Sequence, residues 1–180
     1  MQQRGFTLIE LVVVIAIVAI TTAMVLPRVW HWQREARIGQ LNYARGVVHT
    51  ASMLIHSAAL SRDGRPDLSP CPAGGGTADN ALDGAGSVCT EDGLVRTQHG
   101  YPASAAPGTP GIVAAAGLGS VFNAKPEQLR AQGYEVRVDG PVTTISSVSA
   151  PDPARCSFTY TEPPAARTAA TISVSVLSGC

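Results

Sequence analysis

The chain has 180 residues, a formal net charge of zero and a charged-residue content of only 14%. This length suits one modest domain, and the balanced charge gives no sign of the basic face or stripe of a nucleic-acid-binding protein. Ala, Gly, Ser, Thr and Pro are plentiful, which is more typical of an exported, loop-rich domain than of a cytosolic enzyme.

The first feature along the chain is an apolar segment at residues 6–26. About twenty residues of helix extend roughly 31 Å, enough to cross a hydrocarbon core. A secretory signal peptide has a shorter apolar core with a small-residue cleavage site after it. This core is too long and no clear site of that kind follows, so we expect a membrane-spanning helix that stays on the protein.

One carboxylate, that of Glu10, lies near the start of this segment. An acid in a membrane segment is costly to bury and usually indicates a partner. The alternative is that Glu10 lies near the lipid headgroups of a lone anchor, since it is only one turn into the helix.

The orientation in the membrane follows from two opposing signals. Arg4 favours a cytoplasmic N-terminus, whereas Arg28, Arg34 and Arg37 beyond the segment favour the opposite arrangement. All four cysteines lie downstream and indicate an oxidising compartment there. We therefore expect the downstream region outside the cytoplasm.

Helical periodicity continues after Pro27, where we expect a kink or a loosened turn. Apolar residues recur at steps of three and four: Leu41, Ala44, Val48, Ala51, Ile55 and Ala58. Polar residues follow the opposite side: Asn42, Arg45, His49, Ser52 and His56. This pattern predicts one helix from Phe6 to about Ser61, with a C-cap at Gly64. Its second half, residues 27–62, is predicted to be amphipathic.

His49 and His56 could line a metal or pH site, but a solvated face is favoured. Trp30 and Trp32 are typical of interfacial anchors, with packing between subunits as the alternative.

Residues 63–133 are expected to form an irregular connection with short helices, because turn formers are dense at 65–111. Ile112–Phe122 and the segment from Pro126 to Gly133 are the predicted short helices. Asp79, Asn80 and Asp83 miss the spacing of an EF-hand calcium loop. No metal site is predicted.

Residues 134–180 alternate with a period of two. The predicted strands are residues 134–139, 144–148, 156–161 and 172–176. Four short strands without long crossovers predict an antiparallel sheet packed on the apolar stripe of the helix. The expected fold class is therefore α+β.

The cysteines are Cys71, Cys89, Cys156 and Cys180. None forms a CxxC pair and no histidine lies at ligand spacing, so a zinc site is disfavoured. An even number behind an export segment predicts two disulfides, for which three pairings are possible. If the last two strands form a hairpin centred near Thr168, Cys156 and Cys180 face each other. This register favours the pairs Cys156–Cys180 and Cys71–Cys89. Closing the loop between Cys71 and Cys89 would stabilise the fold by about 3 kcal/mol.

The start of the chain resembles the processing and assembly signal of type IV pilins and of type II secretion pseudopilins. The resemblance rests on RGFTLIE at residues 4–10 and on the apolar run to Leu26. It implies that a prepilin peptidase removes the leader, residues 1–5, after Gly5 and methylates Phe6. It also implies that residues 6–26 form a filament core in which Glu10 pairs with the Phe6 ammonium of a neighbouring subunit.

A second resemblance is to the mannose-sensitive haemagglutinin (MSHA) class of pilins. It rests on HGYP at residues 99–102, Gly111-Ile112 and the ending at residues 156–160 and 178–180. It implies a structural subunit of a surface filament for adhesion, motility or biofilm formation. The alternatives are a minor pilin and a pseudopilin of a type II secretion system.

The implied partners are other copies of the chain in a helical filament, the prepilin peptidase and the assembly machinery of the bacterial inner membrane. The head would lie in the periplasm before assembly and on the extracellular pilus afterwards. No cofactor is expected. No catalytic residues are expected either, because the head offers one histidine, His99, and no surrounding constellation of nucleophile and base.

Overall fold

The structure is a computed structural model that describes residues 7–180, with the side chains of residues 27–30 outside the description. Two compact units divide the chain, residues 1–36 and residues 37–180. Helix α1, Leu8–Ser61, contributes to both units. The predictions for Gly5 and Phe6 lie outside the described residues.

Helix α1 begins at a side-chain cap. The backbone N–H of Glu10 donates to Thr7 Oγ1 at 3.3 Å, which is the first half of the Thr-x-x-Glu capping pattern. The helix runs through Pro27 without a break in its secondary structure and ends at Ser61. Asp63 and Gly64 then adopt left-handed φ angles of 54° and 65°, so the chain turns where the sequence predicts.

The apolar stripe of the second half of α1 is buried. Its buried members are Leu41, Ala44, Val48, Ala51, Ile55 and Ala59. Ala59, rather than the predicted Ala58, is the last fully buried position. The stripe has two partners, because Leu41, Ala44 and Val48 belong to one core cluster and Ile55 and Ala59 to another.

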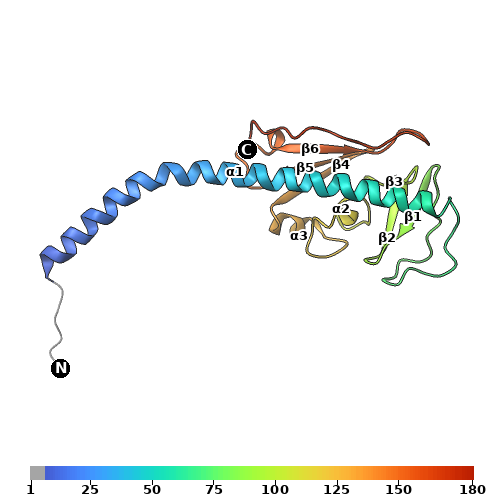
Figure 1. The fold of residues 1–180 in the computed structure, drawn as a ribbon, viewed down its shortest axis with the longest axis horizontal. Coiled ribbons are helices and arrows are strands. Elements are labelled where there is room, and N and C mark those ends of the chain that lie inside the picture. Colours follow the sequence, from blue (N-terminus) through green and yellow to red (C-terminus); the bar gives the residue numbers. More distant parts are fainter. Residues whose placement is uncertain (1–6) are drawn as a thin grey trace, which may run out of the picture. The chain divides into compact units, whose positions relative to one another are not determined.

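The larger cluster joins α1 to a four-stranded antiparallel sheet in the order β4-β5-β6-β7 (Figure 1). The strands are β4 Tyr134–Asp139, β5 Val142–Ser147, β6 Ser157–Thr161 and β7 Thr171–Ile172. The sheet contributes the buried side chains of Tyr134, Ile145, Phe158 and Tyr160. A 3-10 turn, η1 at Pro153–Arg155, lies between β5 and β6. The α+β class and the predicted series of antiparallel strands are confirmed.

The predicted register of the last hairpin is wrong. Tyr160 pairs with Ile172, which centres the hairpin on residue 166 rather than on Thr168. The ladder also stops early, because the Thr159 N–H donates to the Ser173 hydroxyl at 2.9 Å instead of to a backbone carbonyl. A serine side chain that replaces a ladder partner interrupts the strand, and only an isolated Ser157–Val176 bridge follows.

The connection between α1 and β4 is more regular than expected. It holds a second antiparallel sheet of β1 Ala85–Cys89, β2 Leu94–Gln98 and β3 Tyr101–Pro102. Val88 and Val95 face each other in this sheet and pack on Ile55 and Ala59 of α1. The two short helices are α2 Ile112–Ala115 and α3 Pro126–Ala131. The β1–β3 sheet thus packs on the C-terminal end of α1, whereas α2 and α3 contribute Ile112, Val113 and Leu129 to the larger core cluster.

Candidate functional site

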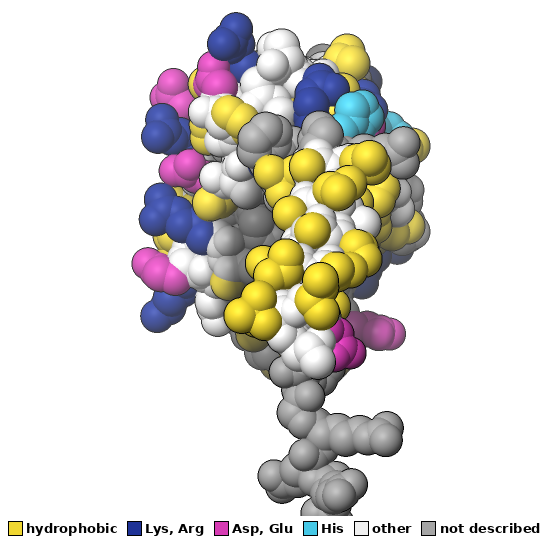
Figure 2. Space-filling model, turned by 90° about the vertical axis from the view of Figure 1, so that its left-hand side faces the viewer, with side chains coloured by type: hydrophobic (Ala, Val, Ile, Leu, Met, Phe, Trp, Pro, Cys, Tyr) yellow, Lys and Arg dark blue, Asp and Glu magenta, His cyan; other side chains and the backbone are white. Residues whose placement is uncertain are grey.

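The apolar first part of α1 is the first candidate site. Leu8–Leu26 has a mean hydropathy of 2.7, is long enough to cross a membrane, and none of it is buried within the chain. Figure 2 shows hydrophobic side chains gathered over the face of this helix. A surface of this kind is stable only against lipid or against other apolar protein.

The threonine hydroxyls within this segment form their hydrogen bonds inside the helix itself. Thr22 donates its hydroxyl to the Val18 carbonyl at 2.7 Å, and Thr21 donates to the carbonyls of Ile17 and Val18 at 3.0 Å. Hydroxyls satisfied within their own helix can enter an apolar environment at low cost.

Glu10 is the exception. Its carboxylate accepts no hydrogen bond and forms no ion pair with residues 7–180, and it is exposed on the helix. An ionised carboxylate carried into lipid or protein without a partner is expensive. The geometry therefore leaves one strong acceptor that has to be satisfied from outside the described chain.

The cysteines form two disulfides in the residue 37–180 unit. Cys71 is bonded to Cys89, and Cys156 is bonded to Cys180, which are the pairings favoured from the sequence. The Cys156–Cys180 bridge forms although the hairpin register differs, because the chain bends after Val176 and the Cys180 N–H donates to the Leu177 carbonyl. Arg37 Nη1 also donates to the Cys180 carbonyl at 2.7 Å, which holds this segment against α1.

The histidines of the predicted solvated face have separate environments. His49 is exposed, as expected, but His56 is half-buried. Its ring stacks on Tyr101 at a centroid distance of 3.8 Å, and its Nδ1 lies 3.3 Å from the Gly100 carbonyl. Ser52 on the same predicted face is buried. The expectation of a fully solvated polar face is wrong at these two positions, because Tyr101 and the turn before β3 contact His56, and Tyr160 of β6 contacts Ser52.

A second tyrosine, Tyr160 of strand β6, is fully buried. The Tyr160 hydroxyl donates to the Pro102 carbonyl at 2.6 Å and also interacts with Ser52. Burial raises the pKa of Tyr160 well above its ordinary value. A phenol that stays protonated and hydrogen-bonded is a structural link between the two sheets rather than a reactive group.

In the acidic loop near residue 80, the carboxylate of Asp79 likewise holds the backbone in place. The Asp79 carboxylate accepts hydrogen bonds from the Ser87 N–H at 2.7 Å and from the Ala81 N–H. No group of three or more His, Cys, Asp or Glu side chains among the described residues could hold a metal ion.

Sequence reasoning missed one polar network. The Asn80 side chain is buried, receives a hydrogen bond from Arg62, and donates to the Arg65 carbonyl and to Asp67. Asn80 also has a positive φ of 53°. An asparagine in a turn-rich segment is compatible with that conformation, but nothing local indicates that it is buried.

Comparison with known proteins bears on the exposed apolar segment and its single acid. Residues 1–26 match the family described as the prokaryotic N-terminal methylation motif. A stretch of 68 residues, 37% of the chain, is 40% identical to a fimbrial protein, EcpB, of Eikenella corrodens. Together, the two matches support a place for this chain in the type IV pilin superfamily.

The extent of these matches is limited. The stretch that matches the fimbrial protein covers 43% of that relative's length. No solved structure gives a significant match. Both matches point to a structural pilin family and not to an enzyme class.

Proposed function

We propose that this pilin is a subunit of a surface pilus of the MSHA kind, used for adhesion, motility or biofilm formation. Before assembly the subunit is held in the inner membrane by residues 6–26, with its head in the periplasm. Prepilin peptidase cleaves after Gly5 and methylates Phe6, and the assembly machinery then adds the subunit to a filament of identical copies.

The observation that carries this proposal is the isolated carboxylate of Glu10. It is the only charged side chain of the Leu8–Leu26 segment, and the nearby threonines need no external partner. A carboxylate and an ammonium each cost much alone in an apolar core, and far less when paired. The Phe6 amine created by cleavage would supply that cation, and only one stagger between subunits satisfies both charges.

The first test removes the carboxylate. We expect Glu10→Val to leave the head folded but to block filament formation or disturb its register, as seen by electron microscopy of cells. Glu35→Gln is the matched control, because Glu35 is an exposed acid on the same helix beyond the apolar segment and its variant should form normal filaments. Normal filaments built from the Glu10→Val protein would overturn the proposed role of Glu10.

The second test is the intact mass of the mature protein. We expect a chain that begins at Phe6, carries one extra methyl group and lacks four hydrogens because of its two disulfides. A mass that retains residues 1–5 would contradict the proposed processing. Micrographs of cells with and without this chain separate long surface fibres from the short periplasmic structure of a pseudopilin.

A further inference from the structure

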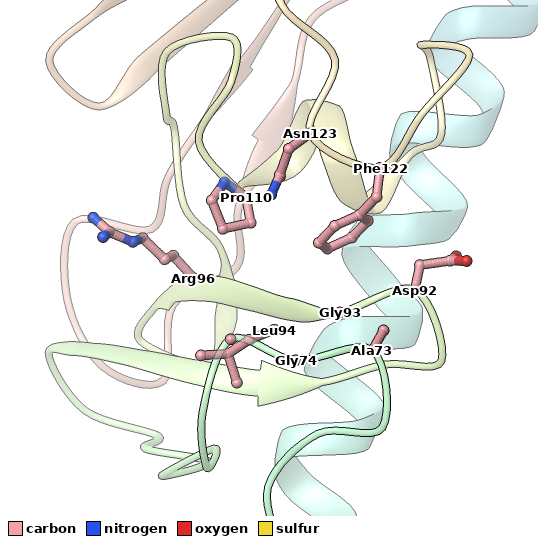
Figure 3. Close-up of a pocket in the computed structure, with 10 residues that line it drawn as sticks. Ala73, Gly74, Asp92, Gly93, Leu94, Arg96, Pro110, Phe122 and Asn123 are labelled. Atoms are coloured by element: carbon pink, nitrogen blue, oxygen red, sulfur yellow. The ribbon is translucent and has the colours of Figure 1, made fainter.

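A cavity lies at each end of the β1–β2 hairpin. The cavity at the turn between the strands has a volume of about 210 Å³ and a wall formed by Phe122. The side chains of Asp92 and Arg96 at its edges point in opposite directions (Figure 3), so they do not meet at one ligand. The cavity at the other end, of about 380 Å³, is lined by His99, which directly follows strand β2.

The ring of His99 completes the β1–β2 ladder at this end. Gly84 and His99 follow the last strand pair, Ala85 and Gln98, and the His99 N–H donates to the Gly84 carbonyl at 2.7 Å. In a regular hydrogen-bonded pair, the Gly84 N–H would donate to the His99 carbonyl in return. It donates instead to Nδ1 of the His99 ring at 3.0 Å. The imidazole therefore takes the place of a backbone acceptor.

The backbone conformation of His99 holds its ring at the turn. His99 has a left-handed φ of 50°, and Gly84 across the pair has a φ of 68°. Histidine is among the few residues other than glycine that are enriched in this region. The His99 side chain is only 13% exposed, so the ring is fixed between the turn and the cavity rather than free in solvent.

The same ring nitrogen has a second neighbour with the opposite requirement. The Asp83 carboxylate lies 3.1 Å from Nδ1 of His99. An unprotonated Nδ1 accepts a hydrogen bond from the Gly84 N–H but has nothing to donate to the carboxylate. A protonated Nδ1 donates to the carboxylate but cannot accept from Gly84. One nitrogen therefore serves only one of these two partners at a time.

Charged groups from several elements face the ring and influence its charge. His56 of α1, Asp83 and the exposed Arg167 of the β6–β7 connection line the same cavity. Glu162, which follows β6, is close enough that a positive charge on His99 opposes the rise in pKa that burial causes at this carboxyl. The carboxylates of Asp83 and Glu162 favour the charged ring, whereas Arg167 and a charged His56 disfavour it.

We propose that His99 is a pH-sensitive switch at this end of the β1–β2 ladder. With a neutral ring, Nδ1 accepts the Gly84 N–H and holds the turn against β2. When the ring gains a proton, Nδ1–H donates to the Asp83 carboxylate and the Gly84 N–H loses its acceptor. Histidine is the side chain that ordinarily changes charge between pH 5 and 8. Mild acid thus opens the last pair, while the Cys71–Cys89 disulfide holds the opposite end of β1.

The test follows hydrogen exchange at the Gly84 amide by NMR of the full chain in detergent micelles at pH 8 and pH 5. The protection factor, which corrects for the intrinsic pH dependence of exchange, should fall on the order of tenfold as the His99 ring gains its proton. Ring ¹⁵N shifts from the same samples report that protonation, and the Val88 amide within β1 is the internal reference. Constant Gly84 protection while the ring becomes protonated would overturn the proposal. A ring that stays neutral at pH 5, or an Nδ1 that already carries a proton at pH 8, would overturn it as well.

The variant His99→Asn separates acceptance from protonation. The asparagine Oδ1 takes the position of the ring Nδ1 and accepts a hydrogen bond at both pH values, and asparagine tolerates a positive φ. We expect this variant to keep the Gly84 amide protected at pH 5. His49→Asn, at the exposed histidine of α1, is the matched control and should lose protection as the parent does. A fall in His99→Asn as large as that in the parent would contradict the switch.

A second variant covers the case in which His99→Asn unfolds, as judged by circular dichroism. Asp83→Asn removes the carboxylate that receives the charged ring, so the loss of Gly84 protection at pH 5 should be smaller than in the parent. An undiminished loss in this variant would overturn the assigned role of Asp83. All samples are unassembled, so the outcome does not depend on the proposed polymerisation.

Discussion

The two halves of helix α1 differ in where their apolar surface finds contacts. Over Leu8–Leu26 the helix is exposed around its whole circumference and none of it is buried within the chain. Between Leu41 and Ala59 one face is almost completely inaccessible to solvent and packs on two sheets. The first half thus depends on its surroundings for stability, whereas the second half is stabilised by its own chain.

A substitution in each half provides the sharpest test of this difference. Leu41 is 0% exposed, so Leu41→Ala should lower the free energy of unfolding of the head by about 2–5 kcal/mol. Val14 is 48% exposed and lies in a segment of which none is buried, so Val14→Ala should cost much less. Urea denaturation followed by near-ultraviolet circular dichroism, in one detergent, measures both. Equal losses would show that the two halves are not distinct.

Removing a disulfide tests which parts of the chain hold the second half in place. Replacing both Cys156 and Cys180 by alanine should lower the unfolding free energy by about 3 kcal/mol on the loop-entropy model. A further loss is expected because both cysteines belong to the larger core cluster. The matched control replaces Cys71 and Cys89, which close a loop of similar length. We expect this control to cost less, and a larger loss in the control would contradict the assignment of the main core.

The smallest expected effect concerns pH. Burial raises the pKa of Glu162, whose carboxylate accepts a hydrogen bond from the Ser104 N–H. A raised pKa means that the folded state favours the protonated acid, so this contribution to stability is present at low pH and is lost as the pH rises through the folded pKa.

The variant Glu162→Gln cannot ionise at this position, so it should not lose stability there as the pH rises. It should melt slightly higher than the parent at pH 7, and the difference should disappear near pH 3, where the parent carboxyl is protonated. Thermal melts at both pH values measure it. Glu127→Gln, in the exposed first turn of α3, is the control and should show no such convergence.

Strong periodic patterns explain why much of the fold could be predicted. Helix α1 buries one face between Leu41 and Ile55, and strands β4 and β6 each pack alternate side chains into the larger core cluster. Burial of this kind leaves a clear period of apolar residues in the sequence. The acid at Glu10 was identified because a charge stands out in an apolar run. These features are local enough to be visible in one chain.

The features that could not be predicted from the sequence depend on contacts between residues that are far apart in the chain. Strand β1 contains Gly86 and Ser87, which are weak strand formers, and it forms because Val88 packs on α1. The β6–β7 ladder ends early because one hydroxyl, that of Ser173, takes the place of a backbone acceptor. The hydrogen-bond partners of Asn80 come from separate segments, so no sequence period reveals them.

The hydroxyl contacts of Thr21 and Thr22 have a consequence for how such a helix changes surroundings. Because each threonine keeps its hydrogen bond inside the helix, moving the segment from lipid into a protein fibre exchanges one apolar solvent for another at these positions. Under the proposed function, the free-energy difference between the two environments is therefore concentrated at a single carboxylate. Insertion and release of a subunit would then be governed by the pairing of one side chain.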